Sequence, residues 1–239
     1  MDTQVYINDR VRTKRRIQRK EDFSVKSVIT KESLRWIVSA ALIASFVVLS
    51  MNFAKYTLNL YCVLFIAIIA LFHKEFSLKL FGKNLASGIK FWLVGAITFA
   101  LMFLVSKLNF FLTYTVFSPK YLDNISYTIK ENMFSYIVLA LTFIVLEPLA
   151  ESLMLRKALL RVDSNIAKVL CVFVSMFVVG IVHAYGVLGI VEAGLLTLPL
   201  TLCYLLTKNI YVTIAAQIAF AMYTYLPDVV YYVARFAMR

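Results

Sequence analysis

Five ionisable side chains fall inside otherwise apolar runs of this sequence: Glu147, Glu151, Arg156, His183 and Glu192. Charged groups are costly within a membrane, and those found there usually face a bundle interior, a cavity or a partner. Glu147 and Glu151 are spaced to share one face of a helix, where two carboxylates at low dielectric repel and one tends to hold a proton. Such a carboxyl can act as a general base, so this stretch is the first candidate for catalysis.

The same residues allow a purely structural interpretation. Arg156 could extend with Lys157 to the cytoplasmic interface, while the two glutamates pair with neighbouring helices. His183, near the end of SMFVVGIVHAYG, could serve as a hydrogen-bond partner between helices. Taken alone, these residues favour the structural interpretation.

Metal, cofactor and serine chemistry lack a sequence signal. The second histidine, His73, lies at an expected span edge, and the chain has no HxxxH, HExxH or GxSxG motif. The three cysteines, Cys62, Cys171 and Cys203, fall in apolar blocks without CxxC spacing. We therefore predict no metal site and no cofactor.

The composition indicates the elements that must hold these groups. The chain is 62% hydrophobic and 16% charged, against about 45–50% and about 25% in soluble domains. The sequence therefore predicts an all-α, polytopic membrane helix bundle with about eight transmembrane helices. The expected spans are 35–54, 56–72, 88–106, 134–160, 167–185, 187–206, 209–226 and a short 229–238. The expected organisation is a basic cytoplasmic tail over 1–34, N-terminal transmembrane helices over 35–133 and a transmembrane core over 134–239.

The net charge of +12 is concentrated at the ends of spans. Its densest stretch, RVRTKRRIQRK (Arg10 to Lys20), has no interleaved aromatic residues, which favours anionic lipid headgroups over nucleic acid as its partner. Lys and Arg recur in alternate connections and at the C-terminus. By the positive-inside rule, we expect a multi-pass protein of the cell membrane with both termini in the cytoplasm.

The order and spacing of three segments resembles the CPBP group of intramembrane proteases (CAAX protease and bacteriocin-processing, also called Abi). That family carries EExxxR, FxxxH, and HxxxN or HxxxD motifs on separate helices. ESLMLR keeps Glu151 and Arg156 of the first motif, and VGIVH keeps His183 of the second. The segment 207–221, TKNIYVTIAAQIAFA, is similar to the third region. The resemblance covers about 135–225, so the core over 134–239 is expected to be CPBP-like.

Each motif also departs from the family pattern. Ser152 replaces the second glutamate, and Val179 replaces the phenylalanine of the second motif. In the third region, Gln217 takes the histidine position and Ala221 the asparagine or aspartate position. Loss of one preorganised oxyanion donor costs about 10²–10³ in rate. These departures predict impaired catalysis.

The resemblance implies a glutamate-activated water that attacks a peptide bond inside a membrane cavity. Carried over, Glu151 is the general base, His183 an electrophilic or water-positioning partner and Arg156 the counter-charge. Gln217 would keep part of an oxyanion role. The expected spans nevertheless place Glu151 and His183 at different depths, and a ten-residue mismatch corresponds to about 15 Å along a helix. They meet only if the fourth helix is shifted or kinked, for which Pro148 is a candidate.

Three functions are compatible with these observations. The first is a catalytically impaired adaptor or regulator of membrane or cell-envelope proteins. The second is an active intramembrane endopeptidase for membrane or prenylated-type peptides, with bacteriocin self-immunity as a further role implied by the resemblance. The third is a small proton-coupled transporter using Glu151 and Glu192. The first two require a membrane protein or peptide partner.

Overall fold

The computed structural model describes residues 32–117, 123–129 and 132–238. Most of the expected basic tail, residues 1–31, lies outside this range. The chain divides into two compact units, 1–42 and 43–239. The described part of the first unit is the beginning of a helix, Glu32–Asn52. All site residues belong to the second unit.

The second unit is helical throughout, and its described residues form no β-strand beyond one isolated antiparallel bridge between Asn124 and Ala184. The predicted all-α class is therefore confirmed. Its α-helices are α2 (Thr57–Phe72), α3 (Leu78–Leu85), α4 (Ile89–Phe111), α5 (Met133–Ala140), α6 (Glu147–Glu151), α7 (Asn165–His183), α8 (Val187–Thr207) and α9 (Ile210–Ala237).

In the described residues, 7 helices are long and apolar enough to cross a membrane. They are Glu32–Asn52, Ala54–Glu75, Ile89–Val116, Met133–Arg161, Asn165–His183, Val187–Thr207 and Ile210–Arg235. The separate short span expected over 229–238 is instead the C-terminal part of α9, which continues through Pro227. A proline removes one backbone donor, but membrane helices tolerate it when local adjustment satisfies the freed groups. The protein is a multi-pass helical membrane protein.

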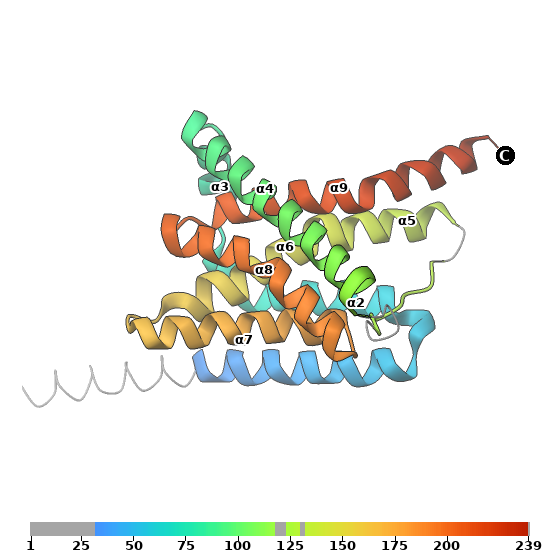
Figure 1. The fold of residues 1–239 in the computed structure, drawn as a ribbon, viewed down its shortest axis with the longest axis horizontal. Coiled ribbons are helices and arrows are strands. Elements are labelled where there is room, and N and C mark those ends of the chain that lie inside the picture. Colours follow the sequence, from blue (N-terminus) through green and yellow to red (C-terminus); the bar gives the residue numbers. More distant parts are fainter. Residues whose placement is uncertain (1–31, 118–122, 130–131, 239) are drawn as a thin grey trace, which may run out of the picture. The chain divides into compact units, whose positions relative to one another are not determined.

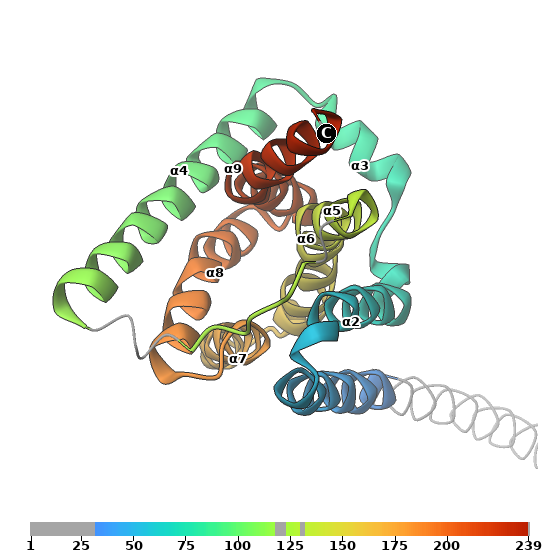
Figure 2. The same cartoon turned by 90° about the vertical axis from the view of Figure 1, so that its right-hand side faces the viewer.

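The Met133–Arg161 segment lies at the centre of the site and is not one regular α-helix. Wider π-helical turns at Leu141–Leu146 and Ser152–Ala158 flank α6, and a 3₁₀ turn at Leu159–Arg161 ends the segment. Such π-helical turns are frequent at functional sites. The segment packs against both α2 and α9, and Figure 2 shows α5 and α6 between these two helices. Figure 1 shows that it runs obliquely to α7.

Two glycines allow α7 and α8 to pack closely. A Cβ at Gly180 would lie 2.5 Å from the carbonyl oxygen of Ile190, and one at Gly194 would lie 2.9 Å from that of Met176. The absence of side chains at these positions therefore brings the two backbones together. This packing fixes the end of α7, which carries His183.

Candidate active site

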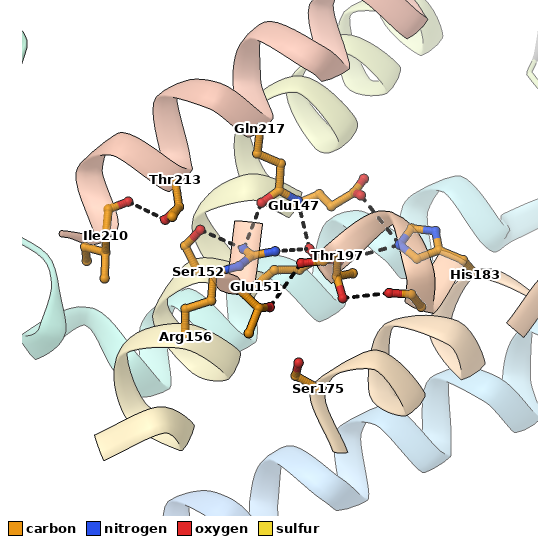
Figure 3. Close-up of polar contacts among 12 residues, drawn as sticks. Glu147, Glu151, Ser152, Arg156, Ser175, His183, Thr197, Ile210, Thr213 and Gln217 are labelled. Atoms are coloured by element: carbon orange, nitrogen blue, oxygen red, sulfur yellow. Dashed lines mark hydrogen bonds and ion pairs between the residues drawn. The ribbon is translucent and has the colours of Figure 1, made fainter. Parts of the chain in front are cut away.

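Glu151 is held by three side chains from three helical segments (Figure 3). Its Oε2 accepts a hydrogen bond of 2.7 Å from Nε2 of Gln217 and lies 3.5 Å from Nη2 of Arg156. Its other oxygen, Oε1, lies 3.7 Å from Nε2 of His183. One oxygen is therefore fixed by the protein, while the other faces the imidazole.

Arg156 is only 1% exposed, so it does not extend to the membrane interface as the structural interpretation suggested. Nη1 donates to Oγ of Ser152 and to Oε1 of Gln217, each at 2.9 Å. The serine that replaces the second motif glutamate thus remains a partner of the arginine. A buried guanidinium needs such a counter-charge and such acceptors.

The end of α7 is anchored from several directions. Tyr61 donates from its hydroxyl to the carbonyl oxygen of Val182 at 2.6 Å, and its ring stacks on His183 with centroids 5.9 Å apart. The carbonyl oxygen of His183 accepts from the backbone N–H of Ile125 at 2.9 Å. The connection between α4 and α5 therefore helps to hold the imidazole in place.

Glu147 joins the pair from the preceding helical turn. Its Oε1 lies 3.5 Å from Nε2 of His183, so the histidine faces two carboxylates at once. The expected depth mismatch therefore does not separate Glu151 from His183. The arithmetic of helical rise assumed parallel, regular helices, whereas the Met133–Arg161 segment is oblique and widened by π-helical turns.

These groups line a cavity of about 510 Å³. Glu147, Glu151, His183 and Gln217 share it with side chains of α4 and α8. The volume is in the range of small-ligand pockets. The cavity therefore has room for a small ligand.

The Glu147, Glu151 and His183 cluster could also hold a metal ion. Each offers one ligand atom, and these atoms lie within 4.8 Å of one another. Two carboxylates and one imidazole are ligand types that zinc accepts, with a fourth position open in catalytic sites. Known metal motifs did not indicate this cluster. Glu147 and Glu151 are four residues apart on one helical segment, whereas His183 lies at the end of α7, far away in the sequence.

The third-motif residues differ in what they offer. Both polar atoms of the Gln217 amide are engaged, with Nε2 on Glu151 and Oε1 on Arg156. Ala221 is buried one turn further along α9 and has no polar side-chain atom. Ala221 therefore donates nothing to a reacting carbonyl, and one of the two N–H groups on Nε2 of Gln217 is already used on Glu151.

The sequence motifs did not identify the four tyrosines that line the cavity among the described residues, Tyr61, Tyr114, Tyr127 and Tyr225. Tyr225 follows Gln217 and Ala221 at four-residue spacing on α9, and this spacing could have indicated it. Its ring stacks on Phe143 with centroids 5.0 Å apart. Tyr127 lies in the α4–α5 connection, where no sequence pattern predicts that it faces the cavity.

Comparison with known families agrees with the motif resemblance. Residues 133–223 match the family described as Rce1-like, type II CAAX prenyl endopeptidase Rce1-like. This segment contains all four predicted site residues, Glu151, Arg156, His183 and Gln217. No curated protein and no solved structure matches the chain significantly.

Proposed function

We propose that this membrane protein, whose residues 133–223 match the Rce1-like family of type II CAAX prenyl endopeptidases, is a slow, glutamate-dependent intramembrane endopeptidase. One observation carries the proposal. Oε1 of Glu151 and Oε1 of Glu147 lie 3.7 Å and 3.5 Å from Nε2 of His183, at the wall of a cavity of about 510 Å³. This is the convergence that a water-activating site requires.

The geometry supports a defined role for each group. A water between Oε1 of Glu151 and Nε2 of His183 gives its proton to the carboxylate while its oxygen attacks the peptide carbonyl carbon. Arg156 and Gln217 hold the opposite carboxylate oxygen, so the base keeps its orientation. His183 then donates from Nε2 to the developing oxyanion, and Glu151 returns the proton to the leaving amine as the C–N bond breaks.

The third-motif departures support low turnover. One N–H group of the Gln217 amide is used on Glu151, its oxygen accepts from Arg156, and Ala221 donates no hydrogen bond. One absent oxyanion donor costs about 10²–10³ in rate. We therefore expect hydrolysis that depends on Glu151 and is slower than a site with the complete motif would give.

The test is peptide hydrolysis by the purified full chain in phospholipid nanodiscs. Quenched-fluorescent apolar peptides, with and without a prenylated cysteine, are incubated with wild type, Glu151→Gln, His183→Ala and the exposed-site control Lys90→Gln. We expect cleavage by wild type and the control, and loss in the two site variants at a temperature at which thermal unfolding shows each variant to be folded. Cleavage that persists in Glu151→Gln would exclude this mechanism.

A second candidate is a catalytically impaired adaptor or regulator of a membrane or cell-envelope protein. The hydrogen bonds of Gln217 to Glu151 and Arg156 favour it, because they stabilise the fold whether or not a substrate is bound. Complementation of a deletion phenotype separates the two functions. Full complementation by both Glu151→Gln and His183→Ala, at normal expression, supports the adaptor and removes the peptidase.

We further propose that the protein resides in the cell membrane with its basic N-terminal tail on the cytoplasmic side, near anionic headgroups. The basic 73–83 connection then lies on the same side. The described chain has 7 candidate spans. With an odd number of spans, this orientation places the C-terminus on the side of the membrane opposite the tail, whereas eight spans would place it in the cytoplasm. Accessibility of single cysteines to an impermeant thiol reagent distinguishes the two arrangements.

A further inference from the structure

The cavity has a second acidic wall that the peptidase proposal does not use. Glu192 of α8 lines the same cavity as Glu147, Glu151 and His183. The motifs of the first, second and third regions do not include it. In the sequence, only its position in an apolar run marked it as unusual.

Glu192 is held by two side chains of the Ile89–Val116 span, which consists of α4 and the π-helical turn that follows it. Oγ1 of Thr113 donates to Oε1 of Glu192, and Nδ2 of Asn109 donates to its backbone carbonyl oxygen at 3.0 Å. Thr113 is 1% exposed and Asn109 is 7% exposed. The carboxylate is therefore positioned by buried groups and does not move freely in the cavity.

One acceptor in this group lacks a donor, and the carboxylate lacks a cationic partner among the described residues. Oδ1 of Asn109 is buried and has no hydrogen-bond partner among the described residues. Within the same described part of the chain, Glu192 forms no ion pair with Lys, Arg or His. An ammonium or guanidinium group carries several N–H donors and a positive charge, so it is suited to a carboxylate that has no cationic partner.

The remaining lining has the same sign. Among the described residues, the cavity is lined by three glutamates and one histidine and by no lysine or arginine. This contrasts with the net charge of +12 for the whole chain. Glu151 has Arg156 as its counter-charge, and Glu147 and Glu151 both face His183. Glu192 is the cavity glutamate without a cationic partner among the described residues, so its end of the cavity favours a positively charged ligand group.

We infer that Glu192, positioned by Asn109 and Thr113, binds the ammonium or guanidinium group of a basic side chain in the peptide that occupies the cavity. This inference deepens the proposed peptidase function and rests on it for the identity of the ligand as a peptide. It assigns Glu192 to substrate selection and not to the reacting bond.

The test measures binding, so it does not depend on cleavage. Fluorescent, N-acetylated apolar peptides carry one lysine at successive positions, and each has a twin with Nε-acetyl-lysine at that position. Affinities are measured with wild type, Glu192→Gln and Asn109→Leu in nanodiscs of neutral lipid. A charge-assisted hydrogen bond corresponds to about tenfold or more in affinity.

For at least one lysine position, we expect the lysine peptide to bind wild type about tenfold or more tightly than its acetylated twin. Glu192→Gln abolishes that difference, and Asn109→Leu reduces it. Equal affinity of the twins for wild type at every position, or an undiminished difference in Glu192→Gln, overturns the inference. A further peptide carries a free N-terminal amine and Nε-acetyl-lysine. If this peptide binds wild type as tightly as the lysine peptide, the ligand is a terminal amine and not a side chain, which also overturns the inference.

The two proposals fail separately. If no peptide is cleaved but lysine selectivity still requires Glu192, the peptidase function fails and the cation site stands. If cleavage requires Glu151 but is the same for lysine and acetyl-lysine peptides and is unchanged in Glu192→Gln, the cation site fails and the peptidase function stands. Thermal unfolding of each variant verifies that the compared proteins are folded.

Discussion

Nε2 of Gln217 donates a hydrogen bond of 2.7 Å to Oε2 of Glu151, and this contact joins α9 to the segment that carries the proposed base. The same amide accepts from Arg156 at 2.9 Å through Oε1. Gln217 therefore bridges a buried carboxylate and a buried guanidinium. At the position where the family has a histidine, this chain has a residue that satisfies both charges and keeps their spacing.

The first prediction removes that bridge with Gln217→Leu. Glu151 and Arg156 each lose a buried partner, so we expect the free energy of unfolding to fall by about 1–3 kcal/mol. Thermal or denaturant unfolding in detergent measures the change. Thr224→Val is the control on the same helix, because it removes a hydroxyl bonded only to Phe220 of α9, and surface changes of this kind cost within about 0.5 kcal/mol. Equal effects of the two substitutions would contradict the bridging role.

The second prediction concerns the ion pair of Glu151 and Arg156. Arg156→Met leaves a buried carboxylate without its cation and is expected to cost about 3–5 kcal/mol. The double variant Glu151→Gln/Arg156→Met removes both charges, so it should recover most of that loss. A double-mutant cycle in unfolding free energy measures the coupling. Additive effects would show that the two side chains do not depend on each other.

Lys157→Met is the control for that cycle. Lys157 follows Arg156 in the sequence, is half-buried, and makes no ion pair with the other described residues. We expect it to change the unfolding free energy by less than about 0.5 kcal/mol. A large effect there would indicate that any loss of charge in this segment destabilises the protein.

The spans and the proposed catalytic residues were predictable because the physical signals are strong. A membrane span must be long and apolar, and an ionisable residue within it is costly, so Glu151, Arg156 and His183 are conspicuous in the sequence. Their order also matched the family motifs. Charge burial therefore marks candidates even without a structure.

Other features depend on geometry that no pattern encodes. The meeting of Glu151 and His183 requires π-helical turns and an oblique segment, whereas ideal rise along parallel helices separates them. Continuity of α9 through Pro227 opposes the usual helix-ending signal of proline. Asn109 is a neutral polar residue, and in an apolar helix such a residue carries no indication that it faces a cavity.

The third prediction concerns pH. Burial raises the pKa of the Tyr127 phenol above its usual 10.0, and the charges of Glu147 and Asp228 add to the effect. Unfolded chains ionise this group more readily, so its stabilising contribution is present below about pH 10 and is lost as the pH rises toward the raised value. One proton limits the slope to about 1.4 kcal/mol per pH unit.

Thermal unfolding of wild type and Tyr127→Phe between about pH 9 and pH 11 checks this sign. We expect wild type to lose stability more steeply than Tyr127→Phe over that range. Tyr56→Phe, at an exposed position, controls for removal of a tyrosine hydroxyl. Equal slopes for wild type and Tyr127→Phe would contradict the prediction.

The fourth prediction compares two glycines in spanning helices. Gly180→Ala places a Cβ 2.5 Å from the carbonyl oxygen of Ile190, and because that atom is backbone, α7 and α8 must separate. Overpacking of this kind costs about 1–3 kcal/mol. His183 lies on the next turn of α7, so we also expect loss of Glu151-dependent hydrolysis.

Gly95→Ala is the matched change in α4, where nothing lies within 4 Å of the added Cβ. Alanine favours a helix over glycine by about 1 kcal/mol, so this variant should be as stable as wild type or more stable. The two substitutions are chemically identical and differ only in what the methyl group meets. Unfolding free energies that shift in opposite directions would therefore show that α7 and α8 leave no room for a side chain at position 180, and loss of hydrolysis in Gly180→Ala alone would show that this packing positions His183. Stabilisation by both would show that the helices can separate without cost.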